Sequence, residues 1–181
     1  MNESQNTDLV RSRPVIELLT VANEYCLFFE KADQYSREDI LDYFRKIAPL
    51  LYLKGSMIPE VVPSDESLSE RFVNEEQWEA VFKTLRGKFG EVDVFYHLDP
   101  NGDSVEASLA DQMADVYQDL KDFVMLYQKA PARENALAEV RALFAHRWGI
   151  RLLHAGTACH RLVFREEAGP DPYEDLDTQP F

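Results

Sequence analysis

The chain has few cysteines, few glycines and no long apolar run. Its 2 cysteines and 7 glycines among 181 residues rule out a disulfide framework and a glycine-rich repeat. No apolar run approaches the roughly 18 residues that a membrane-spanning helix needs, and residues 1–13 lack the apolar core of a signal peptide. These absences predict a cytoplasmic protein in which Cys26 and Cys159 are buried free thiols, while a disulfide between two helices would need an oxidising compartment.

Basic residues are scarce relative to acidic ones. The chain has 19 lysines and arginines against 33 aspartates and glutamates, a net charge of −14. Binding to the phosphate backbone of a nucleic acid, or to an anionic membrane surface, needs the opposite sign, so we expect neither partner. The acidic surface suits solubility, cation binding, or docking to a basic patch on a protein partner.

Sequence motifs that would name an enzyme or a cofactor are also missing. The chain contains no nucleophile elbow, phosphate-binding loop, dinucleotide fingerprint or paired C-x-x-C motif, so no cofactor and no catalytic residue is predicted. His146, His154 and His160 share one expected helix, but their spacing does not align any two for zinc. His97 lies in an irregular segment, and no catalytic role is expected for it.

Helical periodicity and capping residues are abundant. They predict an all-α, single-domain bundle over residues 14–164, with a flexible N-terminus at 1–13 and a disordered acidic tail at 165–181. The expected helices cover 14–34, a segment capped by Ser36, a segment capped by Asn74, a segment from Ser104 or Ser108 to about 129, and 132–164, with an interruption allowed at Gly149. Pro49 should break or bend the second helix. Residues 92–96 allow a short extended piece.

A turn at Asp99-Pro-Asn101-Gly-Asp103 resembles the start of a calcium loop. An EF-hand needs glycine at the sixth position and glutamate at the twelfth, where this chain has Ser104 and Ala110. The sequence therefore favours an ordinary capped turn. Aromatic residues of the first two helices present a similar choice between core packing, which we favour, and a ligand pocket; they are Tyr25, Phe28, Phe29, Tyr43, Phe44 and Tyr52.

Arg151 occupies an unusual position in the last expected helix. At 100° per residue it falls on an apolar stripe between Trp148 and Ala155, with Arg147 at the edge of that stripe. A buried guanidinium needs acidic partners, and Asp119 is the preferred one, with Asp115 second. Replacing Arg151 by alanine should then destabilise the fold by roughly 3 kcal/mol.

The expected carboxylate partners belong to a row of acids in the fourth helix. Asp111, Asp115, Asp119 and Asp122 share one side, which the helical wheel places mostly opposite the apolar face. We therefore expect a solvated face, with a divalent-cation site as the alternative and no tight structural metal. Asp119 is the exception, because it lies near the edge of the apolar face.

A family resemblance is carried by the run Ala110-Asp-Gln-Met-Ala-Asp-Val-Tyr-Gln-Asp-Leu120, by His146-Arg-Trp-Gly149 and by Leu152-Leu-His-Ala155. These segments resemble a bacterial family catalogued only as a domain of unknown function, over roughly residues 15–162. The resemblance implies a compact, all-helical intracellular protein. It supplies no activity, cofactor or catalytic residue.

Two functional hypotheses remain. The first is a non-enzymatic protein–protein interaction or scaffold module whose acidic surface or tail meets a basic partner. The alternative is a small-molecule or metal-binding protein, conceivably a hydrolase, with a pocket around Arg151, Asp115 and Asp119. The first requires carboxylates to seal Arg151, whereas the second requires Arg151 to face an open cavity; the oligomeric state is left open.

Overall fold

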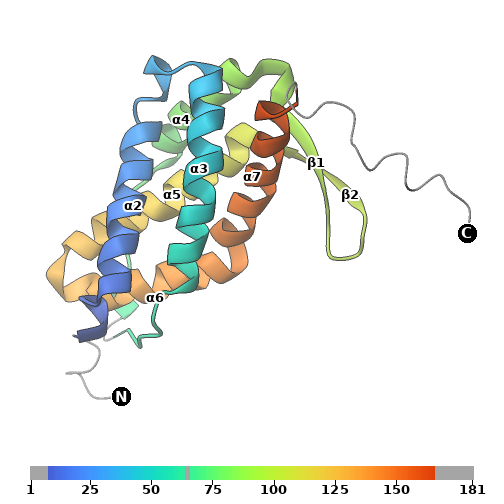
Figure 1. Ribbon diagram of the computed structural model, residues 1–181. Helices are drawn as coiled ribbons and strands as arrows, with labels where there is room; N and C mark the ends of the chain where they lie inside the picture. Colours follow the sequence, from blue (N-terminus) through green and yellow to red (C-terminus); the bar gives the residue numbers. More distant parts are fainter. Residues whose placement is uncertain (1–7, 64–65, 166–181) are drawn as a thin grey trace, which may run out of the picture.

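The computed structural model describes residues 8–63 and 66–165. It is a mostly helical bundle with a small two-stranded hairpin, β1 (Val94–Leu98) and β2 (Ser104–Ser108), on one side (Figure 1). Its helices are α2 (Arg13–Phe29), α3 (Arg37–Ser56), α4 (Glu75–Phe89), α5 (Leu109–Gln128), α6 (Arg133–Leu143) and α7 (Gly149–Val163). A π-helical segment at 144–148 joins α6 to α7, so these two correspond to the single last helix expected from the sequence, and the prediction of five main helices is confirmed.

Helix α5 lies in the centre of the bundle. It packs against α2, α4, α6 and α7, while α3 covers α7 and α2. Figure 1 shows α5 crossing behind α2 and α3. Because neighbours surround it, most of its residues are buried, including polar ones.

The predicted helix starts agree with the capping geometry. Reciprocal capping boxes join Ser36 to Asp39 and Asn74 to Gln77, and Ser108 accepts a hydrogen bond from the backbone N–H of Asp111 at the start of α5. The first helix was expected to cover 14–34, but α2 ends at Phe29, and residues 32–34 form a separate 3₁₀ turn.

Pro49 does not break α3, so that part of the prediction is wrong. The helix is continuous from Arg37 to Ser56 with the proline inside it. Ala48 and Leu51, on either side of Pro49, are buried. Packing of α3 against α7 and α2 stabilises the helix on both flanks and offsets the loss of one backbone hydrogen bond.

The last helical region changes direction at the π-helical segment. In Figure 1, α6 lies across the bottom of the bundle and α7 rises from its end. Gly149 begins α7, and a Cβ there would lie 2.5 Å from the Phe144 carbonyl oxygen. The sequence allowed an interruption of the helix at Gly149. The structure shows a bend there, and the chain stays helical through it. Glycine is required at this position because of the close approach to Phe144.

The expected extended piece is the first strand of an antiparallel hairpin. Val94 pairs with Ser108 and Leu98 with Ser104. The sequence allowed the fourth helix to start at Ser104 or at Ser108. Residues 104–108 form β2, so the start at Ser104 is wrong. In the connecting turn, Asp99 Oδ1 accepts hydrogen bonds from the backbone N–H groups of Asn101 at 2.8 Å and Asp103 at 2.9 Å.

The aromatic residues of the first two helices mostly form core. Tyr25, Phe29 and Phe44 are buried, and Phe28 stacks on Tyr43 with ring centroids 3.6 Å apart. Packing therefore accounts for these five, as favoured from the sequence, whereas Tyr52 is exposed.

The two cysteines behave as the sequence predicts. Cys26 and Cys159 are buried free thiols. Burial raises the pKa of both, which keeps them protonated at neutral pH. No helix in the described ranges is long and apolar enough to cross a bilayer.

The predicted terminal segments fall largely outside the described residues. Of the segment 1–13, the structure describes 8–13, where Val10 is buried and its carbonyl accepts a 2.6 Å hydrogen bond from the Tyr127 hydroxyl. Of the acidic tail, only Arg165 is described, so the expected disorder of the tail stays a prediction.

Candidate functional site

The row of acids lies on α5, and most of it is buried. Relative exposure is 9% for Asp115, 1% for Asp119 and 4% for Asp122, whereas the Asp111 side chain is 42% exposed. The prediction of a solvated face is therefore wrong for Asp115 and Asp122, whereas Asp119, the expected exception, is buried. A helical wheel identifies the apolar side of a helix, but α5 is enclosed on its polar side as well.

Arg151 reaches from α7 to two of these carboxylates. Its Nη2 atom lies 2.7 Å from Asp115 Oδ2, and its Nη1 atom lies 3.3 Å from Asp111 Oδ2. The second-choice partner, Asp115, is thus in contact, whereas the preferred partner, Asp119, is not. The wheel treated 132–164 as one straight helix, but the π-helical segment changes the phase and direction of the chain before Arg151.

Arg147 is the residue that faces Asp119. Its Nε atom lies 3.3 Å from Asp119 Oδ2, and its Nη2 atom lies 3.4 Å from Asp115 Oδ1 and donates to Gln118 Oε1 at 3.1 Å. Trp78 of α4 completes the environment of Asp115, since its indole Nε1 donates to Oδ1 at 2.9 Å. The arginines of the last helical region and the carboxylates of α5 therefore form one interhelical network.

Sequence reasoning missed the contribution of the segment before α4. Asp122 Oδ1 accepts hydrogen bonds from the backbone N–H groups of Phe72 at 2.7 Å and Val73 at 2.8 Å. Arg71 Nη1 lies 3.1 Å from Asp122 Oδ2, and Arg71 Nη2 lies 3.2 Å from Glu139 of α6. Residues 71–73 show no helical or strand periodicity, so the sequence gives no sign that they contact α5. The one available signal was Asp122 itself, an acid for which α5 supplies no basic partner.

Asp119 is the least satisfied member of the network. Neither of its carboxylate oxygens accepts a hydrogen bond from a described residue, and the nearest cations are Arg147 at 3.3 Å and Arg71 at 3.8 Å. Burial raises the pKa of Asp119 to about 6, against the opposing effect of both arginines. The adjoining space, which Asp122 also lines, measures about 10 Å³, roughly the room for one water molecule and too small for a substrate.

The contacts of this network are ones that hold helices together. Its carboxylates face three arginines, so their charge is largely balanced within the protein. In the described part of the chain, no group of three or more His, Cys, Asp or Glu side chains is arranged to hold a metal ion. The network joins α5 to α7 and to the segment before α4, and it fixes how these elements pack.

Open surfaces lie beside the network, at the hairpin. His97 of β1 stacks on His154 of α7 with ring centroids 3.9 Å apart. A cavity of about 500 Å³ lies between β1 and α7, and a second of about 450 Å³ lies between β2 and the helices α4 and α5. His97 borders both cavities, and Arg151 borders the second, so Arg151 is paired with carboxylates and also lines a cavity. The hairpin and its two cavities are therefore the candidate functional site.

Comparison with known proteins gives a consistent family assignment. The model of DUF5063, a domain of unknown function, matches residues 10–165. The chain is also similar to the crystal structure of protein BF1032 from Bacteroides fragilis, with 31% sequence identity, a TM-score of 0.77, and coverage of 85% of this chain and 94% of that one. No curated protein matches the sequence. The resemblance noted from the sequence is confirmed: the chain belongs to the DUF5063 family.

Proposed function

We propose that this protein is a cytoplasmic, non-enzymatic interaction module whose hairpin binds a basic segment of a protein partner. The observation that supports the proposal is an apolar strand exposed on an acidic projection. Val94, Tyr96 and Leu98 alternate along β1 and are 44%, 60% and 67% exposed. Figure 1 shows the hairpin standing out from the side of the bundle. Large side chains exposed together on one strand are typical of a recognition surface.

The charge around these side chains supports a basic partner. Residues 91–108 contain no lysine or arginine and five acids, of which Asp93 is buried against Arg86 and the start of α5. The other four are Glu91, Asp99, Asp103 and Glu106. Glu106 accepts a 2.9 Å hydrogen bond from the Tyr96 hydroxyl and so lies beside the apolar row. A partner segment that alternates apolar and basic side chains would complement both features.

Site-specific photo-crosslinking tests this proposal. A benzophenone amino acid replaces Leu98 on the hairpin in one protein and Leu27, which is 42% exposed on α2, in a matched control. We expect the Leu98 position to crosslink a basic protein that the Leu27 position does not. The affinity of the purified complex should fall roughly tenfold between 0.1 and 0.5 M salt, because charge complementarity is screened.

Two results would defeat the proposal. One is a purified partner whose affinity is independent of salt. The other is an equal crosslinking pattern from both positions, which would mean that the hairpin has no special role.

A second candidate function has one specific observation in its favour. Arg151 lines the cavity of about 450 Å³ together with Asp111, so a small polar ligand could contact the network from the hairpin side. Ligand-observed NMR with small polar fragments tests this candidate. If it is right, some fragments bind the natural chain and no longer bind the Arg151→Met variant. Its metal-binding version requires stoichiometric metal in elemental analysis, and we expect none.

A further inference from the structure

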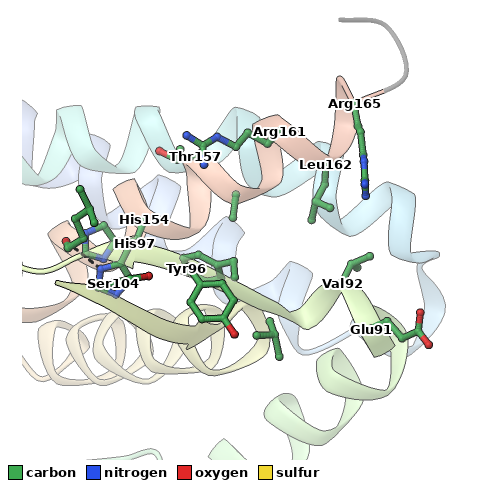
Figure 2. Close-up of a pocket in the computed structure, with 14 residues that line it drawn as sticks. Glu91, Val92, Tyr96, His97, Ser104, His154, Thr157, Arg161, Leu162 and Arg165 are labelled. Carbon is green, nitrogen blue, oxygen red and sulfur yellow. Dashed lines mark hydrogen bonds between the residues drawn. The ribbon is translucent and has the colours of Figure 1, made fainter. Parts of the chain in front are cut away.

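The cavity between β1 and α7 differs in charge from the rest of the molecule. All five residues of β1 line it, and the opposite wall includes His154, Thr157 and Arg161 of α7, with Arg165 beyond the end of that helix. Figure 2 shows His97 and His154 together at one end, Thr157 and Arg161 along α7, and Arg165 and Glu91 toward the other end. Its volume of about 500 Å³ lies in the range of small-molecule sites.

Arginines outnumber carboxylates in this cavity, although the chain has a net charge of −14. Arg161 and Arg165 line it beside the two histidines, and Glu91 is the one carboxylate among the lining residues. Neither arginine forms an ion pair with any residue in 8–63 or 66–165, whereas Arg147 and Arg151 of the same helical region are each paired with two carboxylates. Among the described residues, Arg161 and Arg165 therefore place two positive charges at one cavity without a paired carboxylate.

We propose that this cavity binds a small organic anion, with a carboxylate or phosphate group against Arg161 and Arg165 and an apolar body between β1 and α7. Guanidinium groups bind both kinds of anionic group through paired hydrogen bonds. Val92, Leu98 and Leu162 supply apolar surface for the body of the ligand, and the Thr157 hydroxyl adds a polar contact. The site shares Val94, Tyr96 and Leu98 with the surface proposed to bind a partner, but Arg161 and Arg165 belong to the anion site alone. Substituting these two arginines therefore tests the anion proposal independently of the partner proposal.

The stacked histidines provide a spectroscopic signal for occupancy. Burial lowers the pKa of His154, and the neighbouring His97 and Arg151 lower it further. An anion bound nearby favours the imidazolium form, so occupancy should raise the pKa of His154. This readout requires no knowledge of the biological function.

The experiment uses the full chain and phenyl phosphate as the probe, with benzoate, inorganic phosphate and phenol for comparison. Calorimetry should detect saturable binding of phenyl phosphate, weaker binding of inorganic phosphate and none of phenol. Replacing both arginines (Arg161→Gln with Arg165→Gln) should weaken binding roughly tenfold or more. Arg11→Gln is the matched control, because Arg11 is also exposed and without an ion pair to a described residue, but lies near the other end of the bundle. NMR titration should show a raised His154 pKa in the complex.

The relative affinities of phenyl phosphate and benzoate identify the preferred anionic group, and either order agrees with the proposal. Three results would overturn it: no saturable binding below about 10 mM of either aromatic anion, an equal loss of binding in Arg11→Gln, or phenol binding as tightly as phenyl phosphate. A His154 pKa that stays unchanged at saturation would place the anion elsewhere and would also overturn it.

Discussion

The interior face of α5 and the hairpin beside it use charged side chains in opposite ways. On α5, Asp115, Asp119 and Asp122 are buried and face arginines from other elements. On the hairpin, Glu106 and Tyr96 are exposed, and the Tyr96 hydroxyl donates a hydrogen bond to Glu106 across the two strands. The first arrangement fixes the packing of helices, and the second leaves side chains available for a partner. An unusual charged residue in a sequence can therefore indicate architecture, while the recognition site that we propose lies in a segment with little regularity.

The largest expected effect of breaking the interior arrangement is at Asp122. Asp122→Ala removes the acceptor of the Phe72 and Val73 N–H groups and the partner of Arg71. Stranded buried donors are costly, so the free energy of unfolding should fall by about 3 kcal/mol in urea denaturation. Asp111→Ala is the control, and it should cost under about 1 kcal/mol because that side chain is 42% exposed and faces a partly exposed Arg151. Similar losses for both variants would mean that burial does not distinguish the two carboxylates.

The two arginines of the last helical region should differ in a smaller but measurable way. Arg147→Ala leaves the fully buried Asp119 with only the distant Arg71, and should cost about 2 kcal/mol. Arg151→Ala should cost about 1 kcal/mol, because Asp115 keeps its contacts with Trp78 and Arg147. The sequence-based value of roughly 3 kcal/mol for Arg151 rested on stranding a buried carboxylate, whereas the Arg151 side chain is 26% exposed and Asp115 keeps other partners. A larger loss for Arg151 than for Arg147 in chemical denaturation would make Arg151 the main partner of the buried carboxylates.

The pH dependence of stability sharpens the account of Asp119. Its pKa is raised from 3.8 to about 6, so between these values the folded protein binds a proton there more tightly than the unfolded chain. The contribution of Asp119 to stability is therefore greatest at low pH and is lost as the pH rises through 6. The Asp119→Asn side chain cannot ionise. The free energy of unfolding of this variant, relative to that of the natural chain, should therefore rise by on the order of 2 kcal/mol between pH 4 and pH 7. A stability difference that stays constant across this range would show that the pKa of Asp119 is not raised.

Much of the helical architecture could be predicted because its signals are local. The capping boxes at Ser36 and Asn74 depend on residues three apart, and both form as expected. Of the predicted break or bend at Pro49, the break does not occur, because packing of α3 against its neighbours outweighs the local penalty. The second strand escaped prediction because its residues, such as Val105, gain their partners only when β1 lies alongside.

The candidate site was harder to predict for a related reason. The rule that a buried arginine needs acidic partners suggested Asp115 as a partner of Arg151, and the two are in contact. Which carboxylate faces Arg151 depends on the π-helical segment before α7, which sequence periodicity does not reveal. Arg71 reaches Asp122 from an irregular segment, and His97 meets His154 through the hairpin turn. Contacts between residues so far apart in the sequence follow from tertiary packing and leave no local pattern.

Native-state amide hydrogen exchange tests the division between the two regions most directly. If the α5 network belongs to the cooperative core and the hairpin does not, α5 amides should exchange only by global unfolding. The amides that pair β1 with β2 should then open at a free energy lower by at least about 2 kcal/mol. Opening free energies that are equal for the two regions would contradict the account, because the hairpin would then be as integral to the core as α5.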